Sequence, residues 1–308
     1  MAALAVEADN VGLFYGPRIA LDGVELRVPR GSTVGVLGHN GAGKTSLIRV
    51  LTTSLRPHRG RVLVDGIDVV DNPARVRRSI GVTGQYAGLD DFLTTVENLE
   101  LMARLSGLRR GASARVGDLV ERFDLHAFAS RRVGELSGGS RRRVDLAASL
   151  AGSPKVLFLD EPTTGLDPAA RQLVWEVVTE LTDAGTAVVL TTQYLEEADR
   201  LADQLIVLSQ GRVVARGAPD ELKRLVGGKV VRATVSLDRV DALTRRPVSS
   251  TPAGVGRTTL AFSVADDAAA ADLVAELGAD TSVITDLEVA PRSLDDVFFH
   301  LTQTGAAA

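Results

Sequence analysis

The stretch GHNGAGKTS, residues 38–46, fits the pattern G-x-x-x-x-G-K-[ST]. It follows an apolar strand expected at 32–38 and opens a helix expected at 43–51. Glycines there let backbone N–H groups close around phosphates, and the start of the helix adds a favourable dipole. Lys44 is expected to reach the terminal phosphates, and Thr45 to offer its hydroxyl to Mg²⁺. The alternative, a glycine-rich turn without a ligand, is disfavoured by the strand-to-helix context. The residues predicted to bind nucleotide here are Gly38, His39, Asn40, Gly41, Ala42, Gly43, Lys44, Thr45 and Ser46.

A second stretch, KVLFLDEP at 155–162, complements the first. Val156 to Leu159 predict a buried strand, with Asp160 and Glu161 at its carboxyl end. Asp160 can hold Mg²⁺ through water, and Glu161 can polarise an attacking water molecule. An ordinary acidic strand end is the alternative, which the phosphate loop makes less plausible. Many nucleotide-binding proteins share this much, so a kinase or GTPase remains open at this point.

Composition restricts the classes of protein. The chain has 308 residues, 35 basic and 39 acidic, for a net charge of −4, which argues weakly against a nucleic-acid partner. Because it has no cysteine, disulfides and cysteine-ligated metals are excluded. We expect no secretory signal at MAALAVEADN and no stretch of the ~18 to 20 apolar residues that a membrane span needs. A membrane role is therefore expected to depend on a partner.

The expected elements suggest two domains. Antiparallel strands are predicted around the turn at Gly16-Pro17 and at 60–69, followed by a helical stretch from about 90 to 150. Thr94 and Glu97 predict a capping box before a helix in that stretch. Strand signals return at 155–160 and 186–192, and the character changes near 226–228. We therefore predict an α/β domain at 1–228 and a small α+β domain at 229–308, with strands in KVVRATVSL, RTTLAFSV and TSVITDLEV and helices in DDAAAADLVAEL and RSLDDVFFHLT.

A third stretch narrows the choice of protein class: ELSGGSRRRVDLAASLAG, at 135–152. Ser137-Gly138-Gly139 precedes an amphipathic helix and offers a second helix start to an anion. A chain with one phosphate loop can use a second such turn if it contacts nucleotide held by another subunit. This turn lies upstream of LFLDEP and of TTGLD at 163–167, and the combined order resembles the ATP-binding subunit of an ABC transporter over residues 5 to 225.

This resemblance implies a fold and further roles. The fold is a P-loop ABC ATPase core: a mixed sheet, an antiparallel β subdomain and a helical insert. Tyr15 matches the aromatic that stacks on adenine, and Gln85 the glutamine that touches Mg²⁺ and links to the membrane subunit. Ser137, Gly138 and Gly139 match the signature that binds the partner's γ-phosphate, and Asp167 the loop that joins the two catalytic sites. Taken singly, Tyr15 could be a hairpin aromatic and Gln85 a loop residue. The Mg²⁺ ligands implied are Thr45, Gln85 and Asp160.

The sequence departs from the family pattern at two positions. Ser140 replaces the usual glutamine, and Gln193 stands where a histidine usually follows the last core strand and faces the γ-phosphate. A histidine can carry a proton there, whereas a glutamine amide only donates and accepts hydrogen bonds. We count Gln193 with Glu161 and Lys44 as catalytic; a polar turn residue at a strand exit is the alternative.

The two rival classes fit less well. A kinase or GTPase needs neither Ser137-Gly138-Gly139 nor the loop at Asp167. A soluble ABC protein of translation or DNA repair usually pairs two such domains or inserts a long coiled coil, and this chain shows neither pattern.

Four stretches narrow the resemblance to one subfamily, the daunorubicin/doxorubicin-resistance type of exporter ATPase. They are VTGQ, SGGSRRRVDLAASL, LTTQYLEEADRLAD and PRSLDDVFFHLT. This narrower resemblance implies an ATP-sandwiched homodimer on the cytoplasmic face of the membrane that drives a separate ABC-2-type permease and exports a hydrophobic drug or antibiotic. A lipid or polysaccharide cargo is the alternative. At least two of Arg141, Arg142 and Arg143 are expected on a solvated helix face.

Overall fold

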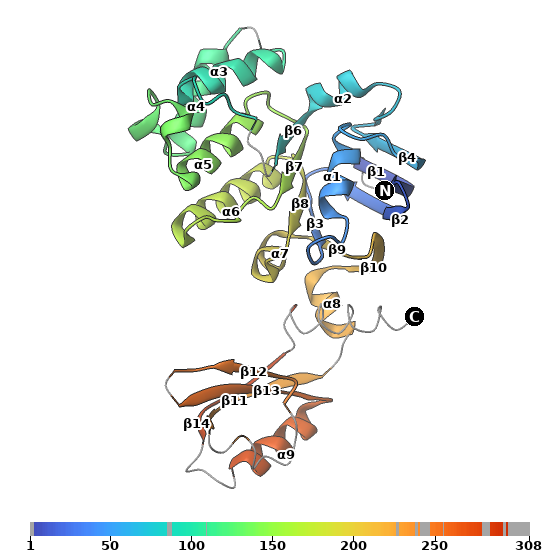
Figure 1. Cartoon of the computed structure of the whole chain (residues 1–308), viewed down its shortest axis with the longest axis vertical. Coiled ribbons are helices and arrows are strands. Elements are labelled where there is room, and N and C mark those ends of the chain that lie inside the picture. The colour runs from blue at the N-terminus through green and yellow to red at the C-terminus, as the bar shows by residue number, and fades with distance from the viewer. Residues whose placement is uncertain are drawn as a thin grey trace. The chain divides into compact units, whose positions relative to one another are not determined.

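The computed structural model describes residues 3–84, 88–108, 110–225, 228–237, 240, 247–254, 256–278, 284–291 and 294. The chain divides into two compact units, Met1–Pro219 and Asp220–Ala308. The boundary expected from the sequence, between 228 and 229, lies just after α8 (Pro219–Leu225), the helix that begins at this division (Figure 1).

The first unit opens with a four-stranded antiparallel sheet in the order β2-β1-β4-β5. β1 (Leu4–Tyr15) and β2 (Arg18–Pro29) form the hairpin predicted around Gly16-Pro17, and Tyr15 pairs with Arg18 at its end. β4 (Arg59–Val64) and β5 (Ile67–Asp68) form the second predicted hairpin. The alternation of apolar and polar residues thus correctly predicted these strands.

A six-stranded sheet in the order β10-β9-β3-β8-β7-β6 forms the centre of the unit. Its pairs are parallel except for the antiparallel edge pair β9–β10. The strands predicted at 32–38, 155–160 and 186–192 correspond to β3, β7 and β8. These three strands are neighbours in the sheet, with β8 in the middle. The strand bounds are β3 (Thr33–Leu37), β6 (Ile80–Thr83), β7 (Val156–Asp160), β8 (Ala187–Thr192), β9 (Gln204–Ser209) and β10 (Arg212–Gly217).

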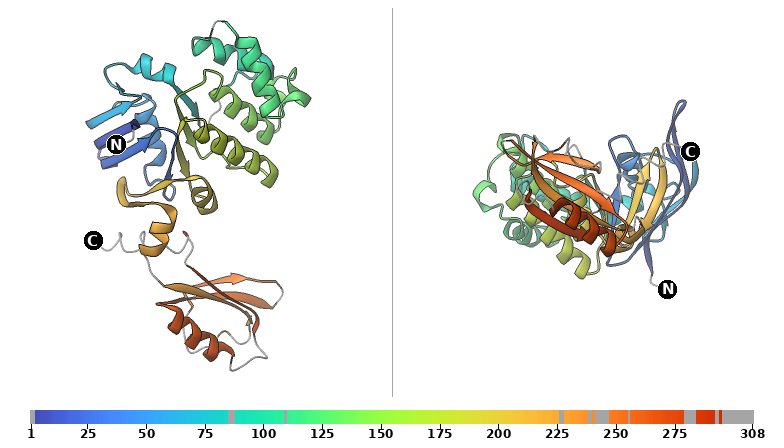
Figure 2. Two further views of the ribbon diagram at one scale, coloured as in Figure 1. Left: turned by 180° about the vertical axis from the view of Figure 1, so that it is seen from behind. Right: turned by 90° about the horizontal axis from the view of Figure 1, so that it is seen from below.

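Helices cover both faces of this sheet. Along β7, Val156 and Phe158 belong to the apolar core shared with α1 and the antiparallel sheet. Leu157 and Leu159 belong to the core under the helical stretch from about 90 to 150, which we call the helical insert. A strand buried on both faces reads as an unbroken apolar run, as the sequence indicated. Figure 2 (left) shows the antiparallel sheet and the helical insert on opposite sides of the parallel sheet. The helices are α1 (Lys44–Leu51), α2 (Pro73–Ser79), α3 (Thr95–Leu105), α4 (Ala112–Arg122), α5 (Gly138–Ser149), α6 (Pro168–Asp183) and α7 (Leu195–Leu201).

Two further local features position the site. Thr94 and Glu97 form the predicted capping box at the start of α3, with both reciprocal hydrogen bonds present. Two short 3₁₀ turns, His126–Phe128 and Val133–Glu135, lead from α4 to the start of α5.

Among the described residues, no helix has both the length and the apolar character required to cross a bilayer.

The second unit is a small α+β arrangement. Its sheet has the order β12-β13-β11-β14, and its core contains Val231, Leu260, Phe262 and Leu273. The predicted strands in KVVRATVSL, RTTLAFSV and TSVITDLEV correspond to β11, β13 and β14, and the predicted helix in DDAAAADLVAEL to α9. The helix predicted in RSLDDVFFHLT lies outside the described residues, apart from Leu294. The bounds are β11 (Lys229–Ser236), β12 (Ser249–Pro252), β13 (Arg257–Val264), α9 (Asp267–Gly278) and β14 (Ile284–Pro291).

Candidate functional site

The phosphate loop connects β3 to α1. Gly43 precedes α1 with φ of 112°, and a Cβ there would lie 2.6 Å from the backbone oxygen of Ala20. Only glycine fits this conformation and this close approach. Lys44 is 5% exposed, and its ammonium donates to the carbonyls of Gly38 at 2.7 Å and His39 at 3.3 Å. The loop therefore curls around a buried cation.

Acidic residues end the neighbouring strand β7. Asp160 is buried, and its carboxylate accepts a 2.5 Å hydrogen bond from Thr191 Oγ1 on β8. The next residue, Glu161, has φ of +51°, a left-handed conformation uncommon outside glycine. Its N–H donates to Thr191 O at 3.0 Å and to Thr191 Oγ1 at 3.1 Å. Its Oε1 lies 3.4 Å from the Lys44 ammonium, so the two halves of the predicted site meet.

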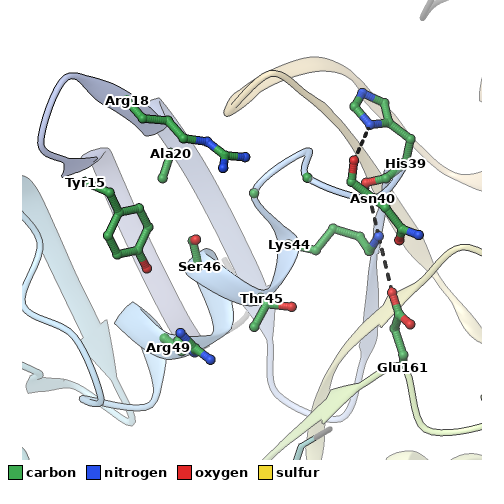
Figure 3. Close-up of a pocket in the computed structure, with 12 residues that line it drawn as sticks. Tyr15, Arg18, Ala20, His39, Asn40, Lys44, Thr45, Ser46, Arg49 and Glu161 are labelled. Atoms are coloured by element: carbon green, nitrogen blue, oxygen red, sulfur yellow. Dashed lines mark hydrogen bonds and ion pairs between the residues drawn. The ribbon is translucent and has the colours of Figure 1, made fainter.

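A pocket of about 610 Å³ opens over the phosphate loop. We call it the loop pocket. Three cationic side chains and one carboxylate line it, a balance that suits a polyanion. Figure 3 shows Lys44 pointing toward Glu161, with Tyr15 and Arg18 at the other end of the pocket. The lining residues are Tyr15, Arg18, Ala20, His39, Asn40, Gly41, Gly43, Lys44, Thr45, Ser46, Arg49 and Glu161.

Sequence reasoning missed three of these lining residues, Arg18, Ala20 and Arg49. Arg18 could have been found, because the hairpin turn at Gly16-Pro17 places it directly opposite Tyr15. Arg49 lies five residues after Lys44 on α1, and no motif indicates that its side chain turns toward the loop.

Several predicted residues do not line the loop pocket. Gly38 and Ala42 are buried in the loop itself, and Asp160 lies beneath its strand end. Gln193 is exposed directly after β8. β8 lies between β3 and β7, with Leu37 opposite Thr192 and Asp160 opposite Thr191. Gln193 therefore leaves the sheet between the strands that carry the phosphate loop and Glu161.

One predicted ligand cannot be placed: Gln85 lies outside the described residues.

A second pocket, of about 470 Å³, lies at the starts of α5 and α6, and we call it the signature pocket. Ser137 Oγ accepts from the N–H of Ser140 and caps α5; Asp167 Oδ1 accepts from the N–H of Ala170 at 2.8 Å and caps α6. Ser137 and Asp167 thus cap helices of their own chain, in addition to the nucleotide contacts predicted for them. The pocket is lined by Asp124, Ser137, Gly139, Ser140, Arg143, Asp167, Ala169, Ala170 and Leu173. Gly138 begins α5 beside it.

Two of the three arginines that follow the signature are partly exposed and pair with exposed carboxylates, as expected for a solvated helix face: Arg141 with Asp91 at 2.6 Å, and Arg143 with Asp124 at 3.6 Å. Arg142 is the most deeply buried of the three, with 15% of its side chain exposed.

Two carboxyl groups of the first unit, those of Asp145 and Glu197, are buried. Burial raises the pKa of Asp145 on α5 to about 6, although Arg142 and the N–H of Gly88 act in the opposite direction. Burial also raises the pKa of Glu197 on α7, which accepts a hydrogen bond from Trp175 Nε1.

The donors near the phosphate loop suit a hard cation. Thr45 and Asp160 offer only oxygen, the element that Mg²⁺ prefers. Among the residues that the structure describes, no group of three His, Cys, Asp or Glu side chains could hold a metal. Such a donor set fits Mg²⁺ that is bound together with substrate phosphates rather than in a protein cage.

Comparison with known proteins identifies the family. Residues 21–164 match a family model described as ABC transporter. The daunorubicin resistance ATP-binding protein DrrA3 of Streptomyces coeruleorubidus is 48% identical over 308 residues, covering 98% of this chain and 97% of that protein. The chain belongs to the ATP-binding proteins of ABC transporters. This ABC ATPase is also 35% identical over 304 residues to the Nod factor export ATP-binding protein I of Rhizobium sp. (strain N33), with 98% of each chain covered.

Solved structures agree with this assignment. The ATP-binding subunit of an ABC transporter matches with a TM-score of 0.68 and 30% identity over 72% of this chain and 93% of the other. A dimeric ATP-binding cassette in a post-hydrolysis state, bound to ADP and Pi, matches with a TM-score of 0.64 and 28% identity over 69% of this chain and 98% of the other. The predicted P-loop ABC core and the predicted transport ATPase are both confirmed.

Proposed function

We propose that this ABC ATPase hydrolyses ATP as a head-to-tail homodimer and drives a separate ABC-2-type permease that exports a hydrophobic drug or antibiotic. One observation carries the proposal: the loop pocket and the signature pocket are separate surfaces of the same chain. Each holds only part of the predicted nucleotide contacts. Two copies related by a two-fold axis would join one surface of each kind at both ATP molecules.

The loop pocket supplies the chemistry. Lys44 binds the terminal phosphates, with Tyr15 against adenine at the other end of the pocket. Glu161 orients and polarises the attacking water, because its carboxylate lies next to the Lys44 ammonium and hence next to the γ-phosphate that this ammonium would bind. Thr45 and Asp160, with Gln85, would hold Mg²⁺, which when bound neutralises phosphate charge.

The signature pocket supplies contacts to the partner's nucleotide. Ser137, Gly138 and Gly139 offer the start of α5 to the γ-phosphate, and Arg143, which pairs with Asp124, lines the same pocket. Asp167, at the start of α6, lies in this pocket and joins it to the loop that follows Glu161. Binding of ATP would thus hold the dimer together, and hydrolysis would loosen it.

The permease surface is proposed on the helical insert, at the cytoplasmic face of the membrane. Phe92, shortly after Gln85, is 82% exposed, and Leu101 and Leu105 on α3 are exposed as well. Exposed apolar side chains of this size are candidates for a protein interface. Residues 229–308 are proposed to form an accessory domain, because every nucleotide motif precedes them.

The nature of the cargo rests on the relatives. The similarity to daunorubicin and doxorubicin resistance proteins supports a hydrophobic drug. Another relative is named for Nod factor export and not for drug resistance. A lipid or polysaccharide cargo therefore stays the alternative. A deletion strain tested against a panel of drugs separates them: sensitivity to hydrophobic antibiotics supports the first, and normal resistance to the whole panel contradicts it.

The nucleotide assignment is tested by Lys44→Ala, which should abolish turnover and sharply weaken ATP binding because the phosphates lose a buried cation. Lys155→Ala is the matched control, since the Lys155 side chain is 62% exposed and pairs with Asp65, which does not line the loop pocket. Its ATP turnover and ATP affinity should equal those of the wild type. Normal ATP turnover by Lys44→Ala would refute the assignment.

A further inference from the structure

Arg142 lies on α5, the helix that follows the signature. Its side chain donates hydrogen bonds to backbone carbonyls around Glu161, the proposed catalytic carboxylate. Its Nη2 donates to the carbonyls of Asp160 at 3.1 Å and Glu161 at 3.0 Å. Its Nε donates to the carbonyl of Pro162 at 3.0 Å. Its Nη1 donates to the carbonyl of Gly84 at 2.6 Å. One side chain therefore binds the last residue of β7, the two residues that follow it, and the residue that follows β6.

A buried carboxylate helps to fix the direction of this guanidinium. Asp145 lies one turn further along α5, and its Oδ2 lies 3.3 Å from Arg142 Nη1. Only 15% of the Arg142 side chain and 5% of the Asp145 side chain are exposed. A planar guanidinium has its donors in a rigid fork, so a fixed orientation serves several acceptors at once.

The backbone that Arg142 binds is strained. Glu161 has φ of +51°, and such a conformation persists in a non-glycine residue when its surroundings hold it from several sides. Thr191 holds the N–H of Glu161, and Arg142 holds its carbonyl. The two contacts come from different elements, β8 and α5, and each fixes one end of Glu161. Both are therefore needed to hold the residue in this conformation.

We propose that Arg142 is a positioning residue that sets the catalytic geometry of Glu161 and couples it to the signature helix. The inference rests on the proposed function, in which the start of α5 contacts the nucleotide of the partner subunit. Because Arg142 lies on that helix, a shift of α5 on contact with the partner's ATP moves the peptide that carries Glu161. Each subunit's glutamate would thus be aligned only when its own signature is engaged.

The adjacent arginine provides a matched comparison. Arg141 precedes Arg142 on α5 and pairs with Asp91 of the helical insert, with 33% of its side chain exposed. It makes none of the contacts with the backbone at 160–162 that the structure gives Arg142. Arg141→Gln therefore removes the same charge from the same helix without touching the catalytic peptide.

The experiment measures kcat and KM for ATP, together with ATP affinity and thermal unfolding, in the full chain. Arg142→Gln should lower kcat by about 30- to 100-fold, as expected for a misplaced catalytic group, with KM and affinity within about twofold of wild type. Arg142→Lys should recover part of kcat, because an ammonium can bond some of the carbonyls. Arg141→Gln should retain wild-type kcat.

A second measurement tests whether Arg142 acts through Glu161. In a Glu161→Gln background, Arg142→Gln should cause no further loss of the residual turnover of radiolabelled ATP. The proposal is overturned if Arg142→Gln keeps wild-type kcat, if its loss appears in KM instead, or if the full loss recurs in the Glu161→Gln background. If Arg142→Gln does not fold, Arg142→Lys is judged by the same criteria. Absence of turnover in the wild type and in Arg141→Gln would instead contradict the proposed function.

Discussion

The ammonium of Lys44 lies 3.4 Å from Oε1 of Glu161, and both side chains are largely buried, at 5% and 13% exposed. The proposed phosphate-binding cation and the proposed water-activating carboxylate therefore form an ion pair. A γ-phosphate arriving at Lys44 competes with this ion pair, and it also brings negative charge close to Glu161.

The first prediction concerns removal of that carboxylate charge. Glu161→Gln should reduce turnover to a small residual rate because no carboxylate base remains to polarise water. It should also bind ATP about two- to tenfold more tightly than the wild type, because Lys44 loses a competing partner and the phosphates lose a repulsive neighbour. Titration with ATP and Mg²⁺ by isothermal calorimetry measures the affinity.

Glu176→Gln is a suitable control for that titration, since Glu176 lies on α6 and accepts a hydrogen bond from Gln172. Its affinity and turnover should match those of the wild type. A weaker affinity in Glu161→Gln would show that the glutamate helps to hold ATP, contrary to this account.

The second prediction concerns Gln193, which leaves the sheet between the phosphate loop and Glu161. A hydrogen bond to a charged group is worth about 1.5 to 3 kcal/mol, so Gln193→Ala should slow hydrolysis by about ten- to a hundredfold with little change in ATP affinity. Gln193→His should stay active but gain a pH dependence near about pH 6 to 7, where an imidazole titrates. The measurement is the pH–rate profile of wild type and both variants.

The bland alternative for Gln193 is a polar residue at a strand exit. It predicts that Gln193→Ala turns over ATP at the wild-type rate, and that outcome would remove Gln193 from the catalytic group.

The third prediction uses Asp145, whose pKa burial raises to about 6 from an ordinary value of 3.8. A raised pKa means that the folded state holds the proton more firmly, so this stabilisation is present at low pH and is lost as pH rises through 6. Between pH 5 and 7.5 the wild type should lose about 1 to 2 kcal/mol of unfolding free energy relative to Asp145→Asn, which cannot titrate. Urea unfolding of both proteins at the two pH values measures this. An identical difference between them at both values would contradict the assignment.

Most of the loop pocket was predictable because its chemistry depends on residues close together in sequence. The run 38–46 forms the loop in a single turn, and the parallel pairing of β3, β7 and β8 brings Glu161 to the same sheet edge. Apolar runs such as 156–159 also predicted buried strands correctly. The order of motifs along the chain therefore carries most of the information about this site.

Contacts between distant elements were less predictable. Arg142 lies in a run of three arginines that reads as a charged helix face, and nothing in the local pattern distinguishes it from Arg141. Its burial results from the packing of α5 against the strand ends, a relation that sequence periodicity does not specify. The strands β9 and β10 were not predicted either, although Leu205 to Leu208 in β9 form a buried apolar run like that of β7.

In the proposed dimer, each ATP lies between the loop pocket of one subunit and the signature pocket of the other. The chain has no cysteine, so introduced thiols report on single positions. In a Glu161→Gln background, a mixture of chains carrying Asn40→Cys and chains carrying Ser137→Cys should form a disulfide-linked dimer under mild oxidation with ATP and Mg²⁺. The same mixture without ATP, and either variant alone, should stay monomeric on a non-reducing gel. Absence of an ATP-dependent link in the mixture, with ATP binding by both variants verified, would contradict the claim.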